Sequence, residues 1–129
     1  MRFDSLILLL ILITPVFLGA QETGVYHESP DSLPNNQTIE LKFIVIANFT
    51  DITWVNGFFR TDTSAAYREK SLRQNRKGMY VLPIAPEELT GDTLYYFVAT
   101  HLDDGRMFSW PPDDPEANPR ACPLYGTRE

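Results

Sequence analysis

Hydrophobic and polar residues alternate along much of the chain from residue 24 to residue 110, a pattern typical of half-buried β-strands. Residues 65–73 fit either an edge strand or one helical turn, and we favour the strand. No long segment has the 3.6-residue period of an amphipathic helix. The pattern therefore predicts an all-β fold, an antiparallel two-sheet sandwich of about seven strands. The expected strands are Val25–Tyr26, Thr38–Ala47, Ile52–Arg60, Ala65–Arg73, Met79–Ile84, Thr93–His101 and Arg106–Trp110.

The strand expected at residues 52–60 has large apolar side chains on both faces. Trp54 and Phe58 lie on one face, because they are four residues apart. Val55 and Phe59 lie on the other. Either pair can fill the core between the two sheets, and the sequence leaves this choice open. Gly57 marks a β-bulge or a close approach by another part of the chain.

The first twenty residues have the layout of a secretory signal peptide. Arg2 precedes an apolar run from Leu6 to Ile13, and small residues at Gly19 and Ala20 come before polar Gln21. The apolar stretch is short for a membrane span, which needs about 20 residues. We expect cleavage after Ala20, with an uncleaved N-terminal anchor as the alternative. The mature protein is then secreted or located in the periplasm or cell envelope, without a stable membrane span.

Composition narrows the range of partners. The net charge is −6, which disfavours nonspecific binding to nucleic acid. Residues 60–77 nevertheless hold a concentration of basic residues, which fits either a solvated face or a patch for an acidic partner. Cys122 is the single cysteine, so the chain has no internal disulfide framework. We expect Cys122 to pack little, as a free thiol or paired with another chain, within a flexible Pro- and Asp-rich tail over residues 113–129.

The segment before the predicted last hairpin resembles a known type of module. Its order of residues is similar to the region between strands E and F of immunoglobulin-like and fibronectin type III-like (early-set type) modules of secreted bacterial proteins. Trp54 stands near the usual core tryptophan position. The resemblance implies a module over residues 21–112 with a role in binding or spacing. The residues that carry it are Pro86, Leu89, Gly91, Asp92, Thr93, Leu94, Tyr95, Tyr96, Phe97, Ala99, Asp103, Asp104 and Gly105.

A tyrosine at the start of such a strand can bury its ring while its hydroxyl group caps the preceding loop. We expect Tyr95 or Tyr96 to do so against residues 89–92.

Residues for catalysis or for metal binding are sparse in the sequence. His27 and His101 are expected on the surface, and a nucleophile with its base would need Cys122 close to one of them. One cysteine and two scattered histidines fall short of a zinc site. The acidic run at residues 103–104 is typical of a turn rather than of a calcium cage, and the run at residues 113–116 leaves calcium binding as an alternative that we do not favour. We therefore expect no enzymatic activity, no catalytic or metal site and no cofactor.

Aromatic residues are the better indication of function. Trp54, Phe58, Tyr67 and Trp110 are the candidate ligand-binding residues, because flat rings on a sheet surface can stack against the C–H faces of sugars. The sequence thus favours an exported interaction or spacer module with a protein or polysaccharide partner at the cell surface. The alternative is a carbohydrate-binding module that uses these surface aromatics.

Overall fold

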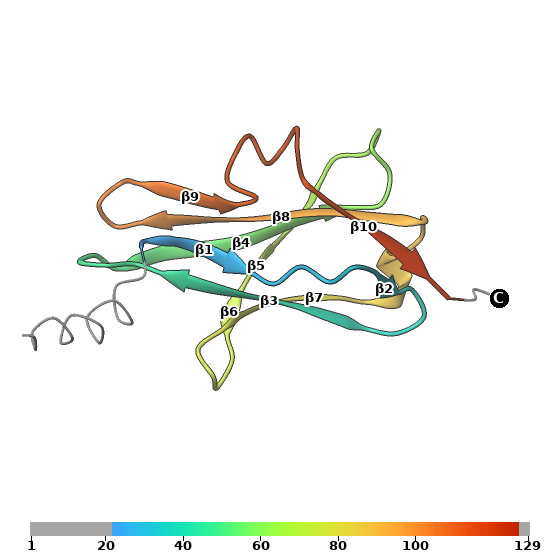
Figure 1. The fold of residues 1–129 in the computed structure, drawn as a ribbon, viewed down its shortest axis with the longest axis horizontal. Coiled ribbons are helices and arrows are strands. Elements are labelled where there is room, and N and C mark those ends of the chain that lie inside the picture. Colours follow the sequence, from blue (N-terminus) through green and yellow to red (C-terminus); the bar gives the residue numbers. More distant parts are fainter. Residues whose placement is uncertain (1–21, 127–129) are drawn as a thin grey trace, which may run out of the picture.

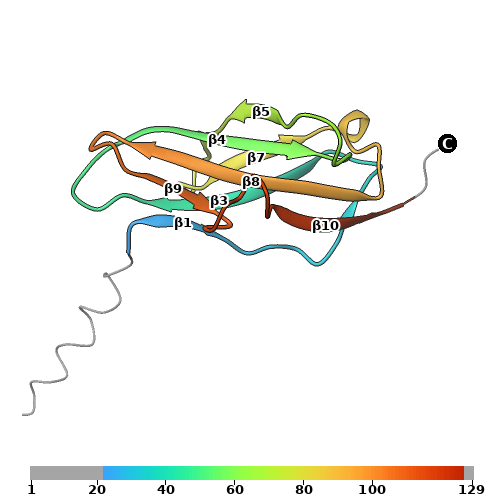
Figure 2. The same ribbon diagram turned by 90° about the horizontal axis from the view of Figure 1, so that it is seen from above.

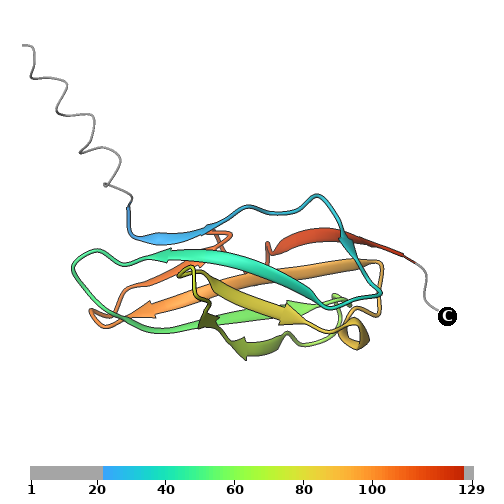
Figure 3. The same ribbon diagram turned by 90° about the horizontal axis from the view of Figure 1, so that it is seen from below.

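The computed structural model describes residues 22–126, which form a sandwich of two β-sheets (Figure 1). The predicted signal peptide at residues 1–20 lies outside the described part of the chain. Within that part, no helix has the length and apolar character needed to cross a membrane. Figures 2 and 3 show the longer strands of both sheets running along the same long axis. This architecture confirms the predicted all-β two-sheet sandwich, and its strand pairs are antiparallel as predicted except for one short parallel pair.

The smaller sheet has four antiparallel strands. β3 (Ile39–Ile46) lies at its centre, between β1 (Gly24–His27) and β7 (Tyr80–Ile84). β6 (Arg73–Gln74) forms the far edge beyond β7. β1 pairs only with residues 43–46 of β3 and then leaves the sheet.

The larger sheet has six strands arranged around β8 (Thr93–Leu102). β4 (Ile52–Arg60) pairs with one edge of β8, and β5 (Arg68–Ser71) continues the sheet beyond β4. The other edge of β8 is shared by β9 and β10. This edge pairs at residues 98–101 with β9 (Met107–Trp110) and at residues 93–96 with β10 (Arg120–Tyr125).

Two short elements complete the fold. β2 (Leu33–Pro34) runs parallel to β10 at the edge of the larger sheet. The N-terminal segment therefore passes from the smaller sheet at β1 to the larger sheet at β2. A 3₁₀ helix, η1 (Pro86–Glu88), lies between β7 and β8.

The core between the two sheets is built from the alternate side chains of each strand that point inward. Of the two pairs on β4 that could fill it, Val55 and Phe59 are the buried pair. Gly57 lies between them and leaves room for Leu82 of β7. The buried residues of the core cluster are Val25, Ile39, Leu41, Phe43, Val55, Phe59, Leu72, Leu82, Ile84, Leu89, Leu94, Tyr96, Val98 and Cys122.

The expectation of a flexible tail over residues 113–129 is wrong for residues 120–125. These residues form β10, which hydrogen-bonds to β8. Cys122 faces the core with no exposed surface, so the expectation that it packs little is also wrong. Burial raises the pKa of its thiol. The short strand is stable here because the neighbouring edge of β8 supplies its hydrogen-bond partners.

The expected tyrosine corner is also wrong. Tyr96 buries its ring in the core, but its hydroxyl oxygen lies 2.8 Å from Nε2 of His27 and 3.4 Å from Oγ of Ser29. The hydroxyl group is therefore bonded to the N-terminal segment rather than to residues 89–92. His27 is correspondingly half-buried rather than a surface residue.

Candidate functional site

Trp54 and Phe58 project from the outward face of β4, on the side opposite the core. Trp54 is 36% exposed and stacks on His101 of β8, with the ring centroids 5.7 Å apart. Phe58 stacks on Phe97 of β8 at 4.6 Å. Both contacts follow from the register, in which each of these residues of β4 lies opposite its partner in β8. Two stacked pairs therefore lie along the same direction on the surface of the larger sheet.

Tyr67 closes one end of this aromatic surface. It precedes β5, yet its ring makes an edge-to-face contact with Phe97 of β8, with the ring centroids 5.1 Å apart. The guanidinium group of Arg60 lies 4.0 Å from the centre of the Tyr67 ring. The hydroxyl group donates a 2.9 Å hydrogen bond to the carbonyl oxygen of Glu116. Burial raises the pKa of Tyr67, so the hydroxyl group keeps its proton at neutral pH.

The connection between β9 and β10 forms a wall beside the aromatic surface. It projects from the sandwich next to the β4–β5 loop (Figure 1), and the bond between Tyr67 and Glu116 joins the two segments. The carbonyl oxygen of Asp114 accepts hydrogen bonds from the N–H groups of Ala117 and Asn118, which folds the wall into a turn.

Together these parts enclose a cleft of about 520 Å³. Four aromatic side chains, those of Trp54, Phe58, Phe97 and Phe108, make up much of its floor. The carboxylate groups of Asp114 and Glu116 stand on the wall, and both residues are exposed. The lining residues are Trp54, Phe58, Phe97, Ala99, Met107, Phe108, Ser109, Pro112, Asp114, Pro115 and Glu116.

A polar pair lies between the two stacks. Asn56 faces outward between Trp54 and Phe58, and its Nδ2 donates a hydrogen bond to Oε2 of Glu69. Oδ1 of Asn56 and Nδ1 of His101 are covered and have no hydrogen-bond partner in the described part of the chain. These two covered polar atoms lie under the aromatic surface, so the stacking rings and not this polar pair are the part of it that a ligand can reach.

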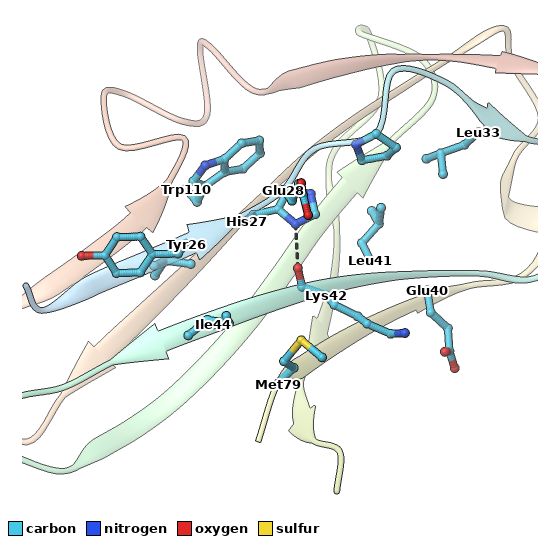
Figure 4. A pocket seen from close by; sticks show the side chains of 12 residues that line it. Tyr26, His27, Glu28, Leu33, Glu40, Leu41, Lys42, Ile44, Met79 and Trp110 are labelled. Atoms are coloured by element: carbon cyan, nitrogen blue, oxygen red, sulfur yellow. Dashed lines mark hydrogen bonds between the residues drawn. The ribbon is translucent and has the colours of Figure 1, made fainter. Parts of the chain in front are cut away.

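Trp110 does not join the other three predicted site residues. It packs on the inner side of the larger sheet, where its ring contacts His27 at 4.7 Å and Tyr96 at 6.0 Å. There it lines a separate groove of about 740 Å³ beside β1 and β3 (Figure 4). Tyr26 and Ile44 lie at this groove with large exposed fractions. The structure therefore brings together Trp54, Phe58 and Tyr67 and places Trp110 apart from them.

His27 lines this groove and also contacts the buried residues Phe43 and Tyr96. Its Nδ1 lies 2.6 Å from the carbonyl oxygen of Lys42, as the dashed line in Figure 4 shows. Burial lowers the pKa of His27 below its ordinary value of 6.5. The nearby charge of Arg120 lowers it further, whereas the hydrogen bond to Lys42 acts in the opposite direction.

Part of the basic segment at residues 60–77 is neutralised at η1. Glu88 forms ion pairs with Lys70 at 3.0 Å and with Arg68 at 3.1 Å. Burial alone would raise the pKa of Glu88, but the N–H group of Ala85 and the two cations lower it overall. These contacts fit the interpretation of a solvated face with local pairing.

The candidate catalytic side chains are distributed over different parts of the fold. His101 lies on the outward face of the larger sheet, His27 lies on the inner side, and Cys122 is buried in the core. Within residues 22–126, no group of three or more His, Cys, Asp or Glu side chains is placed to hold a metal ion.

Several residues of the aromatic surface and its wall were not anticipated from the sequence. Phe97 and His101 belong to a recognisable strand, but their place beside Phe58 and Trp54 depends on a register that the sequence did not give. Glu116 was assigned to a flexible tail. No apolar–polar alternation marks the strand after the wall, because Cys122 and Leu124 alternate with Ala121, Pro123 and Tyr125.

No protein-family model matches the chain, and no curated protein matches it in sequence. Among solved structures, the chain is similar to part of the endo-β-1,4-mannanase from Thermotoga petrophila, with a TM-score of 0.58 and 10% sequence identity. The similarity covers 83% of this chain but 20% of the mannanase chain, so this chain spans a minor part of that enzyme's length. At this identity the likeness concerns the fold: this chain is a β-sandwich structurally similar to one part of an endo-β-1,4-mannanase.

Proposed function

We propose that this chain is a non-catalytic, exported module that binds an uncharged polysaccharide in the cleft between the aromatic surface and its wall. The observation that carries the proposal is that Trp54 and Phe58 both line this cleft from one strand. Aromatic rings that are already packed against neighbours lose little entropy when a sugar stacks on them. Trp54 rests on His101 and Phe58 rests on Phe97.

The charges around the cleft favour a neutral ligand. Asp114 and Glu116 are the charged residues that line it. Carboxylate oxygens accept hydrogen bonds from sugar hydroxyl groups. The same charges repel an acidic polysaccharide, which gives selectivity by disfavouring the wrong partner. The resemblance of the fold to part of an endo-β-1,4-mannanase makes β-linked hexose polymers the first ligands to test.

The test is a pull-down with insoluble β-1,4-mannan, cellulose and xylan, with alginate and polygalacturonate as acidic comparisons. We expect binding to at least one neutral polymer, and a loss of about tenfold or more in affinity for Trp54→Ala and for Phe58→Ala. Tyr26→Ala is the matched control, since Tyr26 is also 36% exposed but lies on the other sheet. Binding to no neutral polymer, or equal losses in all three variants, would contradict the proposal.

A protein partner is the second candidate, and the groove in Figure 4 favours it. Residues 39–42 of β3 have no partner strand on the β1 side within the described residues, so an extended peptide could add to this edge. Tyr26 and Ile44 are the exposed apolar residues beside it. If this groove is the functional surface, Tyr26→Ala should abolish capture of the partner while Trp54→Ala leaves it intact.

A further inference from the structure

The cleft has two different ends, and this difference bears on how a polysaccharide can enter it. Trp54 and Phe58 are four residues apart on β4, which corresponds to roughly 13 Å along an extended strand. A single sugar ring cannot contact both aromatic side chains at this separation. A ligand that uses both must be an oligosaccharide segment that lies along β4.

Beyond Phe58 the path along β4 is covered. The next outward-facing residue of the strand is Arg60, and the ring of Tyr67 lies over its guanidinium group at 4.0 Å. Tyr67 arrives from the β5 side of the sheet and reaches Phe97 on β8. Its hydroxyl group then bonds to the carbonyl oxygen of Glu116 in the wall. The Tyr67 side chain thus spans the floor from one flank of the cleft to the other.

The surface is accordingly divided at this bridge. Tyr67 and Arg60 line a second, smaller hollow and not the cleft, whereas Phe58 and Glu116 line both hollows. At the opposite end, Trp54 and His101 lie near the β8–β9 turn. Met107, which lines the cleft at this end, is 58% exposed. The cleft is therefore blocked beyond Phe58 and exposed beyond Trp54.

We infer that the cleft receives the terminus of a polysaccharide chain, with the terminal sugar stacked on Phe58 in front of the Tyr67 bridge and a later sugar of the chain stacked on Trp54. This inference rests on the proposed function and deepens it. A chain that continues in both directions cannot lie along this floor while Tyr67 bridges to Glu116. The site then selects chain ends or free oligosaccharides over the interior of long chains.

The experiment compares intact β-1,4-mannan, cellulose and xylan with the same polymers after partial acid hydrolysis, which multiplies chain ends at constant mass. For each polymer that binds, we expect the amount of protein bound at saturation to rise in proportion to the number of ends. A soluble oligosaccharide of the same sugar should compete for binding, whereas the monosaccharide should compete at least tenfold less well.

Variants of Tyr67 test the bridge itself. Tyr67→Ala removes the barrier, so it should bind intact polymer at a higher capacity and lose the dependence on chain ends. Tyr67→Phe keeps the ring and should retain that dependence. Thermal melting checks that both variants are folded.

Binding that is independent of chain ends in the wild-type protein would overturn the inference while leaving the proposed function standing. If the wild-type protein binds none of the three polymers, both the inference and the proposed function are overturned.

Discussion

Nε2 of His27 lies 2.8 Å from the hydroxyl oxygen of Tyr96, and this hydrogen bond joins the two sheets of the sandwich. His27 is the last residue of β1 in the smaller sheet, whereas Tyr96 belongs to β8 in the larger one. Nδ1 of His27 faces the carbonyl oxygen of Lys42, which can only accept a hydrogen bond. Nδ1 therefore carries the proton, and Nε2 accepts from Tyr96. The neutral imidazole satisfies both contacts.

We expect the free energy of unfolding to decrease as the pH falls below 6.5. Burial holds the pKa of His27 in the folded protein below 6.5. Between the folded pKa and 6.5 the unfolded chain binds more protons than the folded chain, so acid favours unfolding in this window. Urea denaturation followed by tryptophan fluorescence between about pH 7.5 and pH 5.5 measures the effect.

The variant His27→Gln provides the control for this pH dependence. Glutamine does not titrate, so the slope of stability against pH in the same window should flatten. The lowered pKa values of Asp62, Glu88 and Asp104 place the titration of these carboxylates below the window. If the slope of unfolding free energy against pH is unchanged in His27→Gln, the pH dependence comes from another titrating group.

Tyr96→Phe should destabilise the protein by about 1–3 kcal/mol, because it leaves Nε2 of the half-buried His27 without its donor. Burial raises the pKa of Tyr96 to about 12, so the hydroxyl group is a donor at all ordinary pH values. Chemical denaturation gives the difference in free energy. Tyr95→Phe is the matched control, since Tyr95 faces the opposite side of the same strand, and its change should stay within about 0.5 kcal/mol.

Cys122 should react slowly with an aromatic disulfide reagent in the folded protein and rapidly in urea. The side chain has no exposed surface, and burial raises its pKa, so little thiolate is accessible. The release of coloured thiol follows the reaction. In the control Ala121→Cys, the added thiol lies on the exposed face of β10 and should react at once. Immediate reaction of the wild-type protein would mean that β10 is not docked in solution.

Gly57→Ala should destabilise the protein by about 1–3 kcal/mol through overpacking. A Cβ atom at this position would lie 2.9 Å from Cδ1 of Leu82, which is fully buried and has little room to move. Denaturant titration measures the loss. The double variant Gly57→Ala with Leu82→Val should lose less than the sum of the single variants, because the smaller side chain relieves the contact. If the losses of the two single variants simply add in the double variant, the destabilisation by Gly57→Ala comes from the backbone and not from the contact with Leu82.

The strands of the sandwich could be predicted from alternation alone, because an antiparallel strand with one buried face carries its own pattern. β3 and β8 match their expected positions closely. β10 could not be predicted in this way, because its exposed positions hold Ala121, Pro123 and Tyr125 instead of polar residues, and it follows a Pro- and Asp-rich connection. Its stability comes from the free edge of β8, which is a property of the assembled sheet.

Three of the four candidate binding residues meet on the outward face of the larger sheet, where Trp54 and Phe58 line the cleft and Tyr67 contacts Phe97 at its end, and Trp110 lies apart from them. Trp54, Phe58 and Tyr67 were chosen as large aromatics, and so was Trp110. The register between β8 and β9 sets Trp110 opposite Val98, whose side chain points into the core. Side-chain direction is fixed by pairing, and a shift of one residue would have turned Trp110 to the other face.

By itself, the sequence determined that the chain forms two apolar-faced sheets and that Trp54 and Phe58 share a face opposite to Val55 and Phe59. The tertiary structure decided which face is buried. Leu82 packs closely over Gly57, between Val55 and Phe59, so the smaller sheet covers that side of β4. The other face is left to solvent, with a wall supplied by a distant segment. Local alternation fixes relative orientation, but burial depends on what another part of the chain brings to the surface.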